Sequence, residues 1–437
     1  MKKEITVKYF STNNIDLRYS FKEAVIKGLA PDKGLFFPVS IPKLGTDFFK
    51  RLPGLSLPEI GFEVARHFVG DDISDADLKK ITEEVLNFPI PVVPIEDSVY
   101  TLELFHGPTC AFKDVGARFM SRCLSAFAKQ NQEAVTILVA TSGDTGSAVA
   151  NGFLGVEGVN VIILYPAGKV SKIQEQQLTT MGQNITALEV DGTFDDCQAL
   201  VKTAFGDNDL NAKLSLTSAN SINIARLLPQ SFYYFYAWAQ LQPTDKKVVF
   251  SVPSGNYGNL TGGLLAKQMG LPIDSFIASA NINKVVPDYL NTGKYETKAS
   301  VQTISNAMDV GAPSNFARMM ELYQEKHSDI IKDVKGVWFS DEETEDAIAD
   351  VYNRTKYILD PHGAVGYLGL KKYLNKESEV GVFLETAHPA KFKDTVEKVL
   401  NIEIKVPDYL QECLGKEKKS ILISKEFSEF KSFLLLK

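Results

Sequence analysis

Val135-Thr-Ile-Leu-Val-Ala-Thr-Ser-Gly-Asp-Thr-Gly146 is a strand pattern that runs directly into a loop of small polar residues. Its first half, up to Ala140, is an almost continuous apolar run, and Ser147 to Leu154 then has the small residues of a helix start. A strand that is apolar at successive positions, instead of at alternate ones, is typical of a sheet buried on both faces. The segment therefore predicts a parallel sheet covered by helices, which is an α/β fold.

The same order of strand, loop and helix continues along the chain. Further strands are expected at residues 159–165, 185–190, 214–217, 247–252, 275–279 and 380–384. Helical patterns are expected at residues 172–181, 194–205, 222–238, 260–269, 339–358 and 363–374. Ligands of such sheets bind at the carboxyl ends of the strands. Because the loops at those ends are rich in Gly, Ser, Thr and Asn, we expect the binding site there.

The amino-terminal part of the chain has a different pattern. Helices are expected at residues 21–28 and 77–86, while Pro89-Ile-Pro-Val-Val-Pro94 is typical of a connector. The tail after Gly415 is first charged and then apolar. These changes predict an amino-terminal domain at residues 1–95, a catalytic core of two α/β subdomains at residues 96–400 and a carboxy-terminal tail at residues 401–437.

Length and composition narrow the class of protein. The chain has 437 residues, of which 44% are hydrophobic and 23% charged, as in a soluble globular protein of two or three domains. The net charge is -7 and lysines are interspersed with acidic residues, so nucleic acid is not an expected partner. No apolar run approaches the ~20 residues that cross a bilayer, and the first residues are not a signal peptide. We therefore expect a cytoplasmic protein without a membrane partner.

The cysteines and histidines give no sign of a metal. Cys110, Cys123, Cys197 and Cys413 form no CxxC pair, and none of the five histidines has HExxH spacing. Neither a disulfide framework nor a zinc site fits this distribution. The sequence therefore predicts no metal, and the chemistry must come from another group.

One lysine lies at a junction between a strand and a helix. In Leu104-Phe-His-Gly-Pro-Thr-Cys-Ala-Phe-Lys113-Asp114, a strand pattern and a turn precede Lys113, and a helical pattern follows it. The electropositive start of a helix disfavours an ammonium and lowers its pKa. Lys113 is therefore a candidate amine nucleophile, although most lysines are solvated surface residues.

Three loops have the composition of anion-binding sites. Pro253-Ser-Gly-Asn-Tyr-Gly-Asn259 joins a strand to a helix and offers backbone amides to a phosphate, without Walker or GxGxxG spacing. Thr141 to Gly146 is suited to a carboxylate, and Asn220-Ser-Ile-Asn-Ile-Ala-Arg226 can bring a guanidinium toward an anion at a helix start. Each loop also has an ordinary interpretation, as a tight turn, a helix N-cap or a surface arginine.

Together with Lys113, these loops resemble the threonine synthase family of the fold-type II pyridoxal phosphate enzymes. The amino-terminal segment is similar to the longer branch of that family, but Ser11-Thr-Asn-Asn14 and Asp32-Lys-Gly34 depart from its usual Ser-Thr-Arg-Gly and Asp-Gly-Gly. The matching segments run in the family's order over nearly the whole chain, at residues 20–32, 105–114, 140–147, 217–226, 255–259, 360–366 and 385–392.

The resemblance implies a role for each matching position. Lys113 forms the Schiff base with pyridoxal 5'-phosphate, Asp144 borders the cofactor ring, and Thr386 faces the pyridine nitrogen. A neutral hydroxyl at that nitrogen does not demand a protonated ring, which moderates the cofactor as an electron sink. The implied cofactor-phosphate loop comprises Gly255, Asn256, Tyr257, Gly258 and Asn259. The implied substrate-binding residues are Thr141, Ser142, Gly143, Thr145, Asn220, Ser221 and Arg226.

The resemblance also implies an activity, the conversion of O-phospho-L-homoserine and water to L-threonine and phosphate by a monomer or homodimer. Two alternatives remain. A serine or threonine dehydratase or a cysteine synthase shares the cofactor loops but does not need a phosphate clamp from Asn220 to Arg226. A non-catalytic binding protein on the same fold is expected to have lost the lysine, whereas Lys113 is present.

Overall fold

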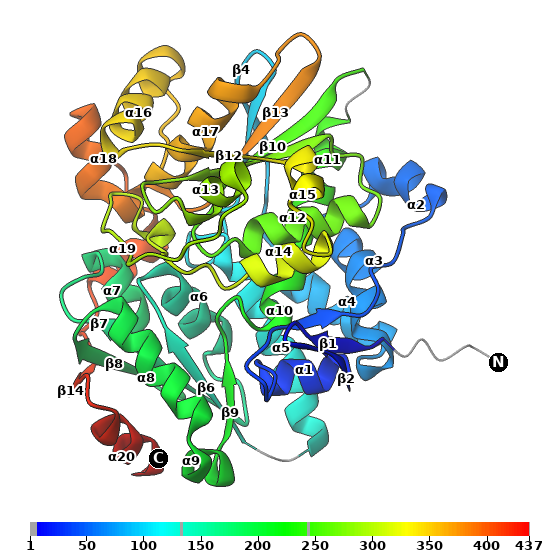
Figure 1. Cartoon of the computed structure of the whole chain (residues 1–437). Coiled ribbons are helices and arrows are strands. Elements are labelled where there is room, and N and C mark those ends of the chain that lie inside the picture. The colour runs from blue at the N-terminus through cyan, green and yellow to red at the C-terminus, as the bar shows by residue number, and fades with distance from the viewer. Residues whose placement is uncertain (1–6, 132–133, 243–244, 437) are drawn as a thin grey trace.

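The computed structural model describes residues 7–131, 134–242 and 245–436. Within these residues the chain forms two large sheets, one in the upper and one in the lower half of Figure 1, and a small antiparallel sheet beside them. Helices pack around both large sheets (Figure 1). The α/β fold with parallel and mixed sheets is thus confirmed.

The lower sheet has five parallel strands, in the order β14-β8-β7-β6-β9. Its strands are β6 (Val135–Ala140), β7 (Val159–Pro166), β8 (Ile185–Asp191), β9 (Ser215–Ser218) and β14 (Ile421–Ser424), and its helices include α6 (Asp144–Phe153), α7 (Lys172–Thr179), α8 (Phe194–Gly206), α9 (Asn208–Lys213) and α20 (Phe427–Leu436). In β6, Ile137 and Val139 belong to the core on one face, together with α6, whereas Leu138 and Ala140 belong to the core on the other, together with α8 and α20. Burial of both faces explains the continuous apolar run.

The upper sheet has six strands, in the order β12-β11-β10-β13-β5-β4, and only the β4–β5 pair is antiparallel. Its strands are β4 (Val92–Glu96), β5 (Val99–Glu103), β10 (Lys247–Pro253), β11 (Ser275–Ala280), β12 (Val334–Trp338) and β13 (Glu379–Glu385). The helices in this half are α11 (Phe232–Leu241), α12 (Gly258–Gln268), α13 (Val285–Thr292), α14 (Phe316–Leu322), α15 (His327–Asp333), α16 (Asp341–Thr355), α17 (Pro361–Tyr373) and α18 (Lys393–Leu400).

The amino-terminal part carries the small sheet and four helices. The strands are β1 (Tyr9–Ser11), β2 (Asn14–Tyr19) and β3 (Phe36–Pro38), and the helices are α1 (Phe21–Lys27), α2 (Thr46–Arg51), α3 (Leu57–Val69) and α4 (Asp75–Val85). Helices α1 and α4 confirm the expected ones, whereas α2 and α3 were not predicted. The connector expected at residues 89–94 is wrong in part, because β4 begins at Val92.

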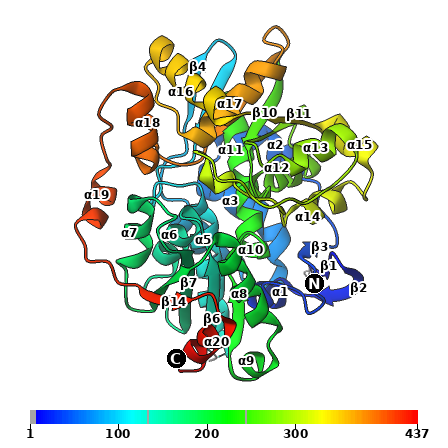
Figure 2. The ribbon, with the colours of Figure 1, turned by 60° about the vertical axis from the view of Figure 1, so that its left-hand side comes forward.

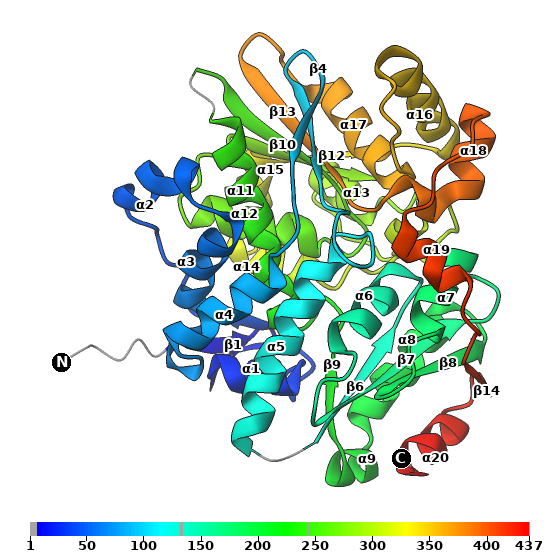
Figure 3. The ribbon, with the colours of Figure 1, turned by 180° about the vertical axis from the view of Figure 1, so that it is seen from behind.

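The chain passes between the two halves several times. Helix α5 (Lys113–Asn131) leads from β5 down to β6 and lies beside α4, as Figure 3 shows from behind. Short elements α10 (Ile224–Leu227) and η3 (Leu228–Ser231) lead back up toward α11. After β13, the turn η5 (Pro389–Phe392) and helices α18 and α19 (Asp408–Leu414) return the chain to the lower sheet, which β14 joins at its edge (Figure 2).

Three other expectations concern disulfides, membrane-spanning helices and metal-binding groups among the described residues. All four cysteines are free and buried. Within residues 7–131, 134–242 and 245–436, no helix is long and apolar enough to cross a membrane. No group of His, Cys, Asp and Glu side chains in the same residues could hold a metal ion.

Candidate active site

A partly enclosed cavity of about 130 Å³ lies where the carboxyl ends of strands from both sheets meet. Its walls come from the loops that follow β6, β9, β10 and β13 and from the first turn of α5. This is the position at which α/β sheets bind ligands. Thirteen of the fifteen predicted site residues line the cavity: Lys113, Thr141, Ser142, Thr145, Asn220, Ser221, Arg226, Gly255, Asn256, Tyr257, Gly258, Asn259 and Thr386. Gly143 and Asp144 do not.

Lys113 is the first residue of α5, at the junction that the sequence predicted. The residue before it is held firmly, because the Phe112 amide donates to the Thr386 carbonyl at 2.9 Å and the Tyr233 hydroxyl donates to the Phe112 carbonyl at 2.5 Å. Burial lowers the pKa of Lys113 to about 8, with Arg226 and Lys391 acting in the same direction and Asp144 against it. A neutral amine is therefore accessible near neutral pH, as a nucleophile or a base requires.

The loop from Gly255 to Asn259 is shaped to hold an anion by its backbone. Tyr257, the N-cap of α12, has a left-handed backbone with φ 59° and gives no side-chain cap to the helix amides. Gly255 has no room for a side chain, since a Cβ would lie 2.6 Å from the Cα of Met308. The Asn259 side chain is engaged within the turn, at 2.7 Å from the Pro253 carbonyl and 2.8 Å from the Ser254 hydroxyl. The backbone amides of this loop and the positive end of α12 thus fit a phosphate.

A second set of anion-binding groups lies on the loop after β9. The Asn220 side chain donates to the Ala140 carbonyl at 3.0 Å, which ties the ends of β9 and β6 together. The Ser221 hydroxyl accepts hydrogen bonds from Asn256 at 2.8 Å and Asn315 at 3.0 Å. These contacts place both side chains between the loop after β10 and the end of β6.

Arg226 is the cation of this second set. It is only 4% exposed, and its Nη1 donates to the Ala219 carbonyl at 2.5 Å. Its Nε has no acceptor among the described residues, and burial lowers its pKa to about 10, although Tyr233 and Asp114 oppose the shift. A buried guanidinium without a carboxylate partner is costly unless an anion neutralises it. Its position on the cavity wall therefore fits an anionic ligand.

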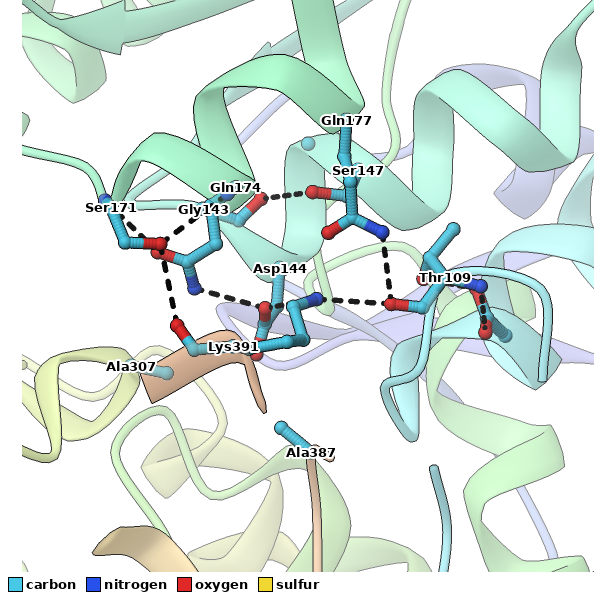
Figure 4. Close-up of polar contacts among 12 residues, drawn as sticks. Thr109, Gly143, Asp144, Ser147, Ser171, Gln174, Gln177, Ala307, Ala387 and Lys391 are labelled. Atoms are coloured by element: carbon cyan, nitrogen blue, oxygen red, sulfur yellow. Dashed lines mark hydrogen bonds and ion pairs between the residues drawn. The ribbon is translucent and has the colours of Figure 1, made fainter. Parts of the chain in front are cut away.

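Asp144 lies behind the cavity wall instead of on it. Its carboxylate is 2.6 Å from the Lys391 ammonium and accepts a hydrogen bond from Gln174 at 3.0 Å (Figure 4). Gly143, with φ 140°, faces the same glutamine, because a Cβ there would meet the Gln174 side chain at 2.5 Å. The assignment of Asp144 to the cofactor ring and of Gly143 to the substrate stays a prediction, and neither residue reaches the cavity surface in this structure.

Several cavity residues received no role from the sequence. His362 lines the cavity, with Nδ1 2.7 Å from an Asp360 oxygen and Nε2 accepting from the Ala307 amide at 3.2 Å. Its segment matched the family motif, which is the signal that could have drawn attention to it. Asp309 also lines the cavity, and burial raises its pKa to about 6 against the hydrogen bonds that lower it. It lies in an irregular segment after η4 (Asn306–Met308), where no sequence pattern indicated a site.

The fold and this cavity define a pyridoxal phosphate enzyme of fold type II. Residues 89–385 match the family described as "Pyridoxal-phosphate dependent enzyme". Residues 8–86 match "Threonine synthase N terminus", and residues 363–434 match "Threonine synthase, C-terminal". An amine of lowered pKa and a helix start whose N-cap residue gives no side-chain cap lie in one cavity. These are the features that such a cofactor needs, so the residues fit it.

Relatives over almost the full length narrow the class further. Threonine synthase from Haemophilus influenzae is 46% identical over 95% of this chain and 96% of its own. The crystal structure of threonine synthase from Escherichia coli superposes with a TM-score of 0.93 at 43% identity, covering 98% of this chain and 99% of that one. A pyridoxal-phosphate-bound threonine synthase from Brucella melitensis gives 0.92 at 34% identity, covering 98% of both chains. The chain therefore belongs to the threonine synthase family.

Proposed function

We propose that this enzyme converts O-phospho-L-homoserine and water to L-threonine and phosphate with pyridoxal 5'-phosphate. One observation carries the substrate assignment: the buried Arg226 guanidinium, with an Nε that has no acceptor among the described residues, lines the same cavity as Lys113. The cofactor phosphate has its own loop at Gly255 to Asn259. A second anion-binding set fits a second phosphate, which dehydratase and cysteine synthase substrates do not require.

Each part of the cavity has a distinct task in this proposal. Lys113 would bond to the cofactor, the amides of Gly255 to Asn259 would hold the cofactor phosphate, and Thr386 would face the pyridine nitrogen. The hydroxyls and amides after β6, at Thr141, Ser142 and Thr145, would receive the substrate carboxylate. When bound, pyridoxal phosphate supplies an acceptor for the electron pair that is left when a proton is removed from the substrate.

The protein groups then move protons and stabilise the leaving group. The Nζ of Lys113, when its amine is free, takes the proton from the α carbon and transfers protons at the β carbon, a role that its lowered pKa suits. Arg226, Asn220 and Ser221 bind the substrate phosphate at the γ carbon and stabilise the dianion as it departs. A proton is then delivered to the γ carbon, water adds its hydroxyl at the β carbon, and a proton is returned to the α carbon. The second proton of this water balances the proton that the departing phosphate takes up.

The experiment that tests the substrate assignment is Arg226→Gln. A guanidinium paired with a phosphate in a buried site contributes about 2–4 kcal/mol, so kcat/KM for O-phosphohomoserine should fall roughly 30- to 1000-fold. The cofactor phosphate is held by a different loop, so the visible absorption of the holoenzyme should be retained. Both are measured on one preparation, together with the melting temperature.

The matched control is Arg118→Gln. Arg118 is a partly buried arginine outside the cavity, with Nη1 3.0 Å from the Asn87 side-chain oxygen, and its loss should leave kcat/KM nearly unchanged. Undiminished turnover of O-phosphohomoserine by Arg226→Gln would remove Arg226 from the substrate clamp. Absence of O-phosphohomoserine turnover in the wild-type enzyme would instead favour a dehydratase or a cysteine synthase. The division at residues 95 and 400, a monomeric or homodimeric assembly and a cytoplasmic location stay predictions.

A further inference from the structure

A buried ion pair joins the two halves of the protein directly behind the cavity. Lys391, on η5 after β13, lies 2.6 Å from Asp144 in the first turn of α6, and their side chains are 0% and 3% exposed (Figure 4). The Lys391 ammonium also donates to the Thr109 carbonyl at 3.1 Å. The pair therefore contacts the turn that leads into Lys113 as well as the helix that follows β6.

Two glutamines of α7 complete the cluster. Gln174 donates to Asp144 at 3.0 Å, and Gln177 donates to the Thr109 carbonyl at 3.1 Å. Thr109 in turn donates to Asp114 through its amide at 2.8 Å and its hydroxyl at 2.5 Å. Because Thr109 precedes Lys113 and Asp114 follows it in α5, the network holds the chain on both sides of Lys113 by contacts from α7 and from η5.

Three charged side chains from different elements affect the protonation of Lys113. Asp144 of α6 favours the protonated amine, whereas Arg226 of α10 and Lys391 of η5 disfavour it. Burial raises the pKa of Asp144, but the Lys391 and Lys113 ammonium groups outweigh burial and hold this pKa below its ordinary value. Other titratable groups also interact with Lys391, namely Cys110, Asp114, His388 and Cys413.

We infer that Lys391 is a positioning residue with two effects. Its contacts with Asp144 and the Thr109 carbonyl connect the turn before Lys113 to α6, and its positive charge offsets the negative charge of the Asp144 carboxylate near Lys113. Without Lys391, Asp144 would have Lys113 as its remaining nearby cation. Without Asp144, Lys113 would face two cations, Arg226 and Lys391. The inference rests on the proposed role of Lys113 but not on the identity of the substrate.

The test uses Lys391→Met, Asp144→Asn and the double variant, each as the holoenzyme. The visible absorption band of the cofactor depends on whether the Nζ of Lys113 carries a proton, so its pH midpoint reports the local charge. Lys391→Met should raise this midpoint and Asp144→Asn should lower it, each by roughly one pH unit. In the double variant the two effects should largely cancel, and the midpoint should return toward the wild-type value.

Thermal unfolding of the same four proteins separates positioning from simple packing. An unpaired buried charge is costlier than a neutral pair, so Lys391→Met should melt below the double variant. A merely structural pair would lower the melting temperature and leave the midpoint unchanged in both single variants, which would overturn the inference. Should Lys391→Met fail to fold, Asp144→Asn alone decides by the direction of its midpoint. No substrate is needed, so failure here is distinguishable from failure of the proposed function.

Discussion

Lys113 shows how much of a residue's reactivity comes from its place in the fold. The sequence located it at a strand-to-helix junction, and the structure adds the surroundings that lower its pKa: burial first, then Arg226 and Lys391. The orientation of the Asp144 side chain toward Lys391 could not be predicted from the sequence, because this ion pair joins residues far apart in the chain.

The orientation of the His362 ring could not be predicted either. It depends on Asp360 and on the backbone amide of Ala307, which is far from His362 in the chain.

The lowered pKa of Lys113 predicts how cofactor-free protein recaptures pyridoxal phosphate. Only the neutral amine attacks an aldehyde, and the folded pKa of about 8 lies below the ordinary value of 10.5. The rate at which the visible band returns should therefore rise with pH, with a midpoint near 8. Lys113→Ala is the control and should show no such band and no threonine formation. A midpoint near the ordinary lysine value would contradict this account of Lys113.

Among the helices and strands, the sequence predicts the strands with two buried faces well. It predicts less well the elements that contain proline, such as β4 and α3. Strands β6, β7 and β10 follow their apolar runs closely, because burial on both faces leaves little choice of side chain. The prolines of residues 89–94 predict a connector, but β4 begins at Val92 and is an edge strand, where a proline such as Pro94 is tolerated. Helix α3 was missed although Pro58 lies in its first turn, a position that proline favours.

The loop between β10 and α12 provides a prediction at this scale. Gly255→Ala would bring a Cβ to 2.6 Å from the Met308 Cα and 3.0 Å from the Ala307 carbonyl oxygen, both of them backbone atoms that yield little. We expect the variant to lose cofactor affinity by tenfold or more, which corresponds to about 1.4 kcal/mol. The matched control is Gly206→Ala, since nothing lies within 4 Å of a Cβ there. Equal cofactor affinity of the two variants, measured by equilibrium dialysis, would show that this loop does not hold the cofactor.

For the molecule as a whole, the carboxy-terminal segment is more than a tail. Strand β14 extends the lower sheet by pairing with β8. Helix α20 follows β14 (Figure 2), and its Phe430 and Leu434 are buried in the core that includes α8. The short charged and apolar stretches gave no sign of this, because a single edge strand gains its order from the sheet it joins. The segment after Gly415 therefore stabilises the lower sheet at a distance from the cavity.

Phe430→Ala tests that attachment. The side chain is 0% exposed, and removing a buried phenylalanine typically costs about 3–5 kcal/mol, so the free energy of unfolding should fall by about that amount. The visible band of the cofactor should persist at low temperature, since no residue of α20 lines the cavity. Leu436→Ala on the same helix is the control, because Leu436 is 88% exposed and its loss should matter little. A similar free energy of unfolding for the two variants would contradict the docking of α20.

In the proposed reaction, phosphate leaves from the γ carbon and water adds at the β carbon within one cavity. The most direct measurement is turnover of O-phosphohomoserine in water labelled with heavy oxygen, followed by mass spectrometry of both products. The account predicts one labelled oxygen in threonine, unlabelled phosphate at first release and equal amounts of the two products. Label in phosphate together with unlabelled homoserine would indicate simple phosphatase action and would contradict the account.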